Sequence, residues 1–200
     1  MKPDFPSLIP KPMNTVLFAA ARHRSTRKDL LKLIREVHPA HPCHFTFASD
    51  RDRREYEREL KGELIDHVRN HLVIVIGPPI SGKTQLLRAL IELKHGADKL
   101  PTFTPRNASE IEKCLASATL SQADACFFDN LTTLKCSQLS TRATAEDISF
   151  RRMGMQRFET VPNTMRIYIT CPVGTKVPAE LERRSRIIRL ASYQVSKYAA

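Results

Sequence analysis

The sequence lacks any long hydrophobic run. No apolar stretch approaches the roughly 18 residues of a membrane-spanning helix. The first ten residues, MKPDFPSLIP, also lack the apolar segment that a signal peptide carries. We therefore expect no membrane span, no membrane partner and a cytoplasmic location.

The sequence also lacks closely paired cysteines. It has five cysteines, and none of them forms a C-x-x-C pair: Cys43, Cys114, Cys126, Cys136 and Cys171. A chain of 200 residues can bury roughly 70% of its unfolded surface, so it does not need disulfides for stability. We expect reduced cysteines, some of them in the core, in preference to a metal or redox centre.

One segment, HPAHPCH, brings ligand-type residues close together: His38, His41, Cys43 and His44. Such a cluster is compatible with zinc. However, the prolines favour an extended chain and no second cluster of ligands follows in the sequence. We therefore favour an extended segment over a zinc site.

Acidic residues are scarce relative to basic ones. The chain has 21 Asp and Glu against 32 Lys and Arg, which gives a net charge of +11. An excess of this size favours a polyanionic partner, and we expect nucleic acid, specifically DNA. The alternative is a basic surface that is only solvated.

The most informative stretch runs from residue 71 to residue 93, HLVIVIGPPISGKTQLLRALIEL. The apolar, β-branched run at residues 72–76 is typical of a buried parallel strand. The loop that follows fits G-x-x-x-x-G-K-[ST] at every fixed position, and Leu86, Leu87, Leu90 and Ile91 then repeat at helical spacing up to a stop at Gly96. Strand, glycine-rich loop and helix are the context that this phosphate-binding motif requires.

The chemistry of phosphate binding explains these residue types. Gly77 and Gly82 let the backbone N–H groups turn toward phosphate oxygens, and the helix adds the positive end of its dipole. Lys83 can reach the β- and γ-phosphates, and the Thr84 hydroxyl can bind Mg²⁺. The expected binding segment for ATP is Gly77, Pro78, Pro79, Ile80, Ser81, Gly82, Lys83 and Thr84. The alternative is a chance match in a loop rich in Gly and Pro.

A second element follows the predicted helix at residues 107–120. The apolar run at residues 125–128 reads as a short strand that ends in Asp129. An acid in this place suits the aspartate that holds Mg²⁺ through water in proteins with a phosphate-binding loop. Asn130 comes next, where many hydrolases of this type carry a glutamate base. An amide cannot accept a proton, but it can orient water or contact the γ-phosphate.

The last fifty residues predict further alternation of strands and helices. Residues 150–171 read as strands broken by turns at Gly154 and Pro162, with a core strand at residues 166–171. A short helix at residues 178–184 and a last strand at residues 186–190 follow. We expect three arginines to project from the first of these regions and to contact DNA: Arg151, Arg152 and Arg157. The alternation predicts a three-layer α/β fold with a parallel central sheet covered on both faces.

The chain ahead of the phosphate-binding loop is expected to be an extension. Residues 1–20 read as an arm, and the basic cluster at residues 22–28 precedes a helix that begins near Thr26. Residues 52–69 predict a long charged helix, in which Tyr56, Leu60, Leu64 and Val68 form a narrow apolar stripe. We expect an N-terminal arm and helical extension at residues 1–50 and a P-loop ATPase domain at residues 51–200.

The order of these parts resembles a known family. GPPISGKT, FFDN, RRMG, VPN, IYIT and LERRSRIIRL follow one another as in the AAA+-type ATPase domains of phage, plasmid and mobile-element replication proteins. Some members are attached to primases, and others are superfamily 3 helicases. The resemblance covers residues 72–190 and implies an AAA+-like P-loop NTPase that uses ATP and Mg²⁺.

The resemblance also implies roles for single residues. Lys83, Thr84 and Asp129 match the residues that hold the nucleotide and Mg²⁺, and Arg184 matches an arginine finger or sensor. Arg151 matches a basic residue in a loop that often touches DNA. The family often has Gly-Asn-Asn after its sensor strand, where this chain has Cys171-Pro172-Val173, so only Thr170 can replace the missing asparagine.

The function implied is ATP-driven work on DNA, as a helicase or loader in the replication of a phage or mobile element. Such proteins bind ATP between subunits, so we expect a ring or filament, with a separate primase or replication protein as a further partner. One alternative is a nucleotide or small-molecule kinase, and another is an ATP-dependent DNA-binding module without turnover. Arg183, Arg184 and Arg186 lie too close together for a core and are expected at the surface.

Overall fold

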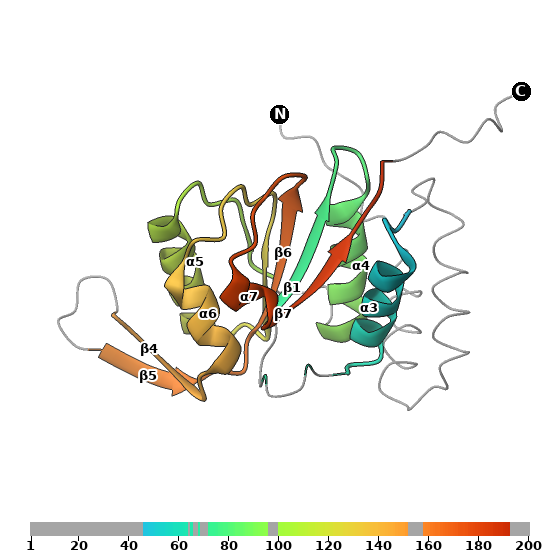
Figure 1. The fold of residues 1–200 in the computed structure, drawn as a ribbon. Coiled ribbons are helices and arrows are strands. Elements are labelled where there is room, and N and C mark those ends of the chain that lie inside the picture. Colours follow the sequence, from blue (N-terminus) through green and yellow to red (C-terminus); the bar gives the residue numbers. More distant parts are fainter. Residues whose placement is uncertain are drawn as a thin grey trace, which may run out of the picture.

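The centre of the molecule is a parallel β-sheet (Figure 1). The computed structural model describes residues 46–63, 65, 68, 72–95, 100–151 and 158–192. The strand order is β2-β3-β6-β1-β7, and every neighbouring pair is parallel. The strands are β1 (Leu72–Gly77), β2 (Thr102–Phe103), β3 (Ala125–Phe128), β6 (Arg166–Pro172) and β7 (Ser185–Arg189).

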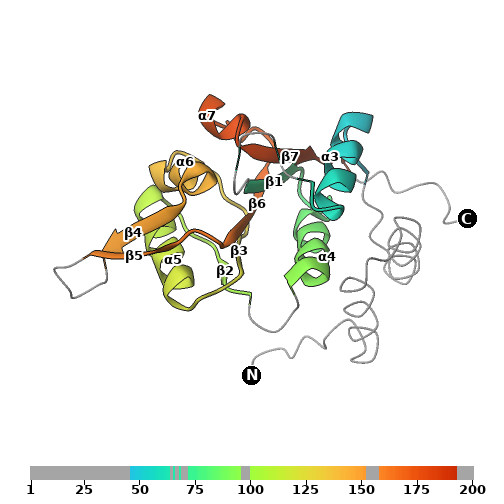
Figure 2. The same ribbon diagram turned by 90° about the horizontal axis from the view of Figure 1, so that it is seen from below.

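Helices cover both faces of this sheet (Figure 2). α5 (Ala108–Leu120), α6 (Ser137–Thr144) and α7 (Ala179–Glu182) pack on one face, and α4 (Lys83–His95) and α3 (Asp50–Leu60) pack on the other. Each face has its own hydrophobic cluster. The predicted three-layer α/β fold with a parallel central sheet is confirmed.

β1 shows why the sequence forms this sheet. All six of its residues are buried. Val73 and Val75 pack toward α4, whereas Ile74 and Ile76 pack toward α5 and α6, because successive side chains of a strand point to opposite faces. The strand therefore has to be apolar on both sides, which is the continuous pattern seen in the sequence.

The predicted helix after the glycine-rich loop is confirmed as α4. Its apolar positions Leu86, Leu87, Leu90 and Ile91 are all buried against the sheet. α5 and the strands β3, β6 and β7 also lie where the sequence predicts them, within two residues at each end.

The predicted helix at residues 52–69 is wrong in its length. α3 ends at Leu60, and Lys61 is its C-cap. Gly62 then adopts a left-handed conformation with φ of 72°, its N–H donates to the Glu59 carbonyl, and the Glu63 N–H donates to the Arg58 carbonyl. This is a Schellman motif, which a glycine makes easy and which stops the helix. Val68 is buried in the cluster on the other face of the sheet, so it does not continue the stripe of Tyr56 and Leu60.

The expected surface position of the arginine cluster is wrong for Arg186. Its side chain is 2% exposed and pairs with Glu55 at 2.8 Å and with Glu59 at 3.1 Å. Its third contact is a 2.6 Å hydrogen bond to the Glu63 carbonyl. The arginine is buried because α3 supplies acceptors for it, and these contacts fasten α3 to β7.

A separate β-hairpin extends from the body beside α5 and α6 (Figure 1). β4 (Asp147–Arg151) and β5 (Phe158–Pro162) pair with each other in antiparallel fashion and with no strand of the central sheet. Asn163, just after β5, donates from Nδ2 to the carbonyls of Arg142 and Ala145. The hairpin is therefore tied to the C-terminal end of α6.

The remaining predictions divide between described and other residues. Cys126, Cys136 and Cys171 are free and buried, and Cys114 is free and partly buried, which confirms core cysteines. The arm, the basic cluster, the helix near Thr26 and the HPAHPCH segment lie outside the described residues, as do Gly96 and Gly154. Over the described part of the chain, none of the helices combines the length and apolar character needed to cross a membrane.

Candidate nucleotide-binding site

The glycine-rich loop joins the end of β1 to the start of α4. A Cβ atom at Gly77 would lie 2.7 Å from Ser81 Oγ and 3.1 Å from Leu190 Cβ, so only glycine fits there. Gly82 has φ of 80°, a backbone conformation that side chains with a Cβ disfavour. The two fixed glycines of the motif are thus required by close approach at one position and by backbone geometry at the other.

Ile80, at the tip of this loop, is strained. Its φ is 62°, and a β-branched residue rarely adopts such a value. Its side chain is 92% exposed, so packing does not compensate. Strain of this kind costs on the order of 1–3 kcal/mol and concentrates at ligand-binding positions.

The N-terminus of α4 is oriented as a phosphate site. The Leu86 N–H closes the first turn on the Gly82 carbonyl at 2.8 Å, so the N–H groups of the preceding residues have no intrahelical acceptor. The first turn contains no acidic residue. The positive end of the helix dipole therefore faces the loop without a competing carboxylate.

Lys83 reaches back over the loop. Its Nζ donates a 2.7 Å hydrogen bond to the Pro78 carbonyl. Burial lowers the pKa of the Lys83 ammonium below its ordinary value, and the nearby Asp129 carboxylate acts in the opposite direction. The cation lies within the loop that it is predicted to serve.

Asp129 is held by two hydroxyl groups. Its Oδ1 accepts a 2.9 Å hydrogen bond from Thr84 and a 2.6 Å hydrogen bond from Thr170. Its backbone N–H donates to the Phe103 carbonyl at 2.9 Å. The two predicted Mg²⁺ residues, Thr84 and Asp129, are thus in direct contact, and both carry the oxygen ligands that Mg²⁺ prefers.

Asn130 is fixed by the same threonine. Its N–H donates a 2.7 Å hydrogen bond to Thr170 Oγ1, and its φ of 58° is one that asparagine tolerates. The Thr170 hydroxyl accepts from Asn130 and donates to Asp129, so it sets the position of both. Thr170 takes this place because β6 lies between β1 and β3, with Thr170 beside Val75 of β1.

Comparison with known proteins adds a likeness of fold. No protein-family model matches the chain, and no curated protein matches it in sequence. A structure of NtrX from Brucella abortus in complex with ATP is 15% identical, with 82% of this chain and 43% of that chain covered and a TM-score of 0.46. A second NtrX structure, in complex with ADP, is 12% identical, with 89% and 45% covered and a TM-score of 0.48. This chain spans less than half the length of either.

The protein has the α/β P-loop NTPase fold. In this fold the loop after β1 and the ends of β3 and β6 meet at the carboxyl edge of the sheet, where ligands of open α/β sheets bind. Lys83, Thr84, Asp129 and Thr170 all lie at that edge.

Two observations test whether a nucleotide fits. Ser81 Oγ is buried in the loop and, among the described residues, has no hydrogen-bond partner, so it is available to a phosphate oxygen. Next to Gly77 lies a cavity of about 410 Å³, lined in part by Ile76, Val173, Val177 and Leu190. These apolar side chains suit a base, and the buried hydroxyl of Thr175, which also lines the cavity, has no partner within the described structure. The residues present therefore fit a nucleotide.

Not all the predicted residues gather here. The Arg184 carbonyl accepts from the Leu72 N–H, which places Arg184 at the start of β1 and β7. The length of β1 therefore separates it from Gly77, roughly 15–20 Å at the rise of a strand. Its Nη1 donates to the Ser140 carbonyl at 3.4 Å. In its own chain, Arg184 cannot contact a nucleotide bound at the loop.

The predicted DNA-binding residues lie elsewhere again. Arg151 ends β4 in the hairpin and is exposed, whereas Arg152 and Arg157 lie outside the described residues. Sequence reasoning did not identify the Phe103 carbonyl, the orphan Ser81 hydroxyl or Thr175, because each depends on residues distant in the chain. No group of three or more His, Cys, Asp or Glu suited to a metal occurs in the part of the chain that the structure describes.

Proposed function

We propose that the protein binds ATP with Mg²⁺ and hydrolyses it, as an AAA+-type ATPase. The observation that carries this proposal is the 2.9 Å contact between Thr84 at the start of α4 and Asp129 at the end of β3. Two oxygen ligands at the mouth of a glycine-rich loop serve little purpose without a phosphate-bound cation. The orphan Ser81 hydroxyl and the cavity beside Gly77 add support.

Each residue then has a defined role. The loop N–H groups and the α4 N-terminus bind phosphate oxygens, and Lys83 places a positive charge among them. Thr84 and Asp129 would hold Mg²⁺, which when bound supplies positive charge that neutralises the phosphates. Thr170 keeps the Asp129 carboxylate and the Asn130 backbone in place.

We further propose that the ATPase acts on DNA, as a helicase or loader in the replication of a phage or mobile element. Support comes from the net charge of +11 and from the projecting hairpin that carries Arg151. In this proposal the protein forms a ring or filament and works with a separate primase or other replication protein.

The test is phosphate release measured against DNA concentration, with the mass of the protein in solution determined with and without ATP. We expect turnover that DNA stimulates and Lys83→Ala abolishes, with unchanged circular dichroism. Turnover that requires a small phosphate acceptor instead would identify a kinase, and the ATPase proposal would be wrong.

DNA binding through the hairpin has its own test. If about six phosphates are neutralised, log K falls against log salt with a slope of around −5. Replacing Arg151, Arg152 and Arg157 together by alanine should weaken binding and make this slope shallower. A triple variant that binds as tightly as the parent removes the hairpin from the interface.

A second candidate function is ATP-dependent DNA binding without turnover. It is favoured by Asn130, whose amide cannot act as the base that activates water. Under this reading ATP binds with Mg²⁺ and changes the affinity for DNA, but no phosphate is released. Measurement of ATP affinity and phosphate release on the same sample separates the two functions.

A further inference from the structure

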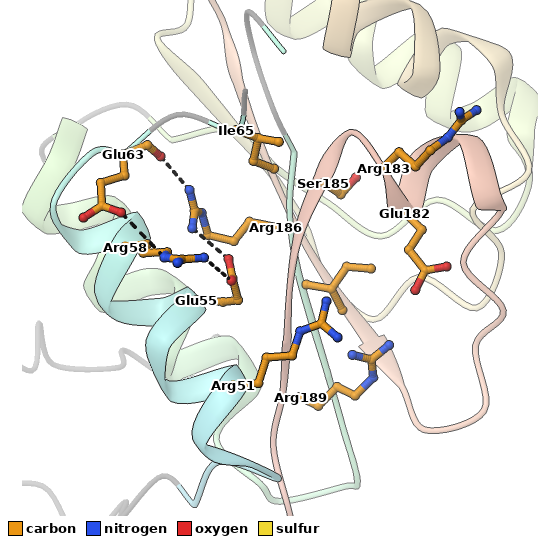
Figure 3. Close-up of a pocket in the computed structure, with 11 residues that line it drawn as sticks. Arg51, Glu55, Arg58, Glu63, Ile65, Glu182, Arg183, Ser185, Arg186 and Arg189 are labelled. Carbon is orange, nitrogen blue, oxygen red and sulfur yellow. Dashed lines mark hydrogen bonds and ion pairs between the residues drawn. The ribbon is translucent and has the colours of Figure 1, made fainter. Parts of the chain in front are cut away.

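A groove lined by arginines lies between α3 and β7, away from the glycine-rich loop (Figure 3). Its volume is about 510 Å³. Five arginines line it: Arg51, Arg58, Arg183, Arg186 and Arg189. We call it the arginine groove. It follows β7 from Ser185 to Arg189, and β7 is an edge strand of the sheet.

The acidic side chains of α3 and the turn after it are already used. Glu55 contacts Arg186 at 2.8 Å and Arg58 at 2.9 Å. Glu63 lies 3.7 Å from Arg58 and gives its carbonyl to Arg186. Figure 3 draws these contacts at one end of the groove. Arg58 and Arg186 are therefore neutralised.

The other end of the groove is different. Arg51 is exposed and makes no hydrogen bond or ion pair with any described residue. Arg189 is 48% exposed, and its nearest carboxylate, that of Asp52, is 4.0 Å away. Figure 3 shows the Arg51 and Arg189 side chains together at this end. Two cations in one groove repel each other unless an anion lies between them.

A buried hydroxyl gives a second, independent observation. Ser185 lines the groove and is only 6% exposed. Its Oγ is buried and has no hydrogen-bond partner among the described residues. A buried hydroxyl without a partner is costly, and an oxygen of a bound ligand would satisfy it.

We propose that the arginine groove binds the phosphodiester backbone of a nucleic-acid strand. Arg51 and Arg189 would neutralise phosphates, and Ser185 would donate to a phosphate oxygen. A free nucleotide fits less well, because the only apolar side chains in the lining are Ile65 and Ile187. Along β7 the groove runs for roughly 15 Å, which is long enough for several phosphates of a strand.

This site is additional to the proposed function. It uses neither the glycine-rich loop nor the hairpin, and it does not require ATP. Glu182 also lines the groove and is exposed, so its negative charge opposes the bound backbone. Glu182→Gln is therefore expected to strengthen binding.

The experiment measures binding of a labelled oligothymidylate by fluorescence anisotropy, without nucleotide and over a range of salt. Arg51→Gln with Arg189→Gln should weaken binding about tenfold or more and make the salt slope shallower by about two. Ser185→Ala should weaken binding a few-fold with no change of slope, because it removes a neutral donor. The matched control is Arg106→Gln with Lys113→Gln, a double change at two exposed positions in and just before α5.

Several outcomes would overturn the proposal. One is a groove double variant that binds like the control pair and melts at the same temperature. Another is loss of binding only in Arg151→Gln, which would leave the hairpin as the interface and the proposed function intact. A third is unchanged oligothymidylate binding combined with lost binding to phosphatidylserine vesicles. Lys83→Ala should bind the oligonucleotide normally, so failure of the ATPase proposal would not affect this result.

Discussion

The hydroxyl of Thr84 donates a 2.9 Å hydrogen bond to Oδ1 of Asp129, a residue 45 positions further along the chain. Thr170 donates to the same oxygen at 2.6 Å. One carboxylate oxygen therefore connects the start of α4 with the ends of β3 and β6. The arrangement leaves the other oxygen of the carboxylate free of these two contacts.

The first prediction concerns Mg²⁺. If Asp129 holds the ion through water, Asp129→Asn should raise the Mg²⁺ concentration for half-maximal ATP turnover by roughly 10- to 100-fold. Thr84→Val should act in the same direction, because it removes a direct oxygen ligand. Thr132→Val is the control, since Thr132 is exposed and outside the site. A normal Mg²⁺ titration for Asp129→Asn would show that this aspartate does not serve the metal.

Local patterns in the sequence were sufficient to predict most of this site. The loop residues and Asp129 follow buried apolar strands, and strands of this kind must end at one edge of a parallel sheet. The hydroxyl partners of Asp129 were harder to predict. Thr170 was included only through a family resemblance, and its two hydrogen bonds depend on β6 lying between β1 and β3.

Predictions of the fold failed where tertiary contacts override local patterns. α6 was missed because SQLSTRAT is short and polar, and Leu139 and Ala143 become apolar anchors only against the sheet. α3 was extended too far because Gly62 was not read as a helix stop. Arg186 was expected at the surface because its acidic partners lie more than 120 positions earlier.

The second prediction concerns that buried arginine. Arg186→Met should destabilise the fold by about 3–5 kcal/mol, because it removes a partner of Glu59, which is 0% exposed. Replacing both residues, with Glu59→Leu added, should cost less than the sum of the single changes, since no unpaired carboxylate remains. Urea unfolding of the four proteins measures this. Fully additive losses would mean that the ion pair does not couple α3 to β7.

The third prediction concerns pH. Burial lowers the pKa of His95 below its ordinary value of about 6.5, and the neighbouring Lys94 and Arg166 cations add to this. The unfolded chain therefore binds a proton at His95 more readily than the native protein does, so this contribution is complete above pH 6.5 and is lost as pH falls through the native pKa. Acidification from pH 7.5 should lower the melting temperature.

His95→Gln tests the origin of that loss. The His95 ring nitrogen lies 2.9 Å from the Tyr168 hydroxyl, and glutamine can retain a hydrogen bond there while losing the titration. The variant should show a smaller drop in melting temperature between pH 7.5 and pH 5. An unchanged drop would assign the pH dependence to other groups.

The last prediction concerns Arg184. It lies at the opposite edge of the sheet from Gly77, so any action on ATP must be on a nucleotide bound by a neighbouring subunit. An arginine that reaches a neighbour's γ-phosphate stabilises the charge of the transition state and contributes on the order of 10³–10⁵ in rate. Arg184→Ala should therefore lower turnover sharply while ATP affinity stays the same. Arg183→Ala, at the exposed neighbouring position, is the control.

Mixing two inactive variants shows whether Arg184 acts between subunits. Lys83→Ala subunits retain Arg184, and Arg184→Ala subunits retain an intact loop. An interface formed by one subunit of each kind has both a working loop and a working arginine, so the mixture should regain part of the ATPase activity. Asn130 cannot act as a base and the sensor asparagine is replaced, which makes turnover depend more strongly on this arginine. Wild-type turnover by Arg184→Ala alone, or no recovery in a mixture whose co-assembly is proven, would exclude the action between subunits.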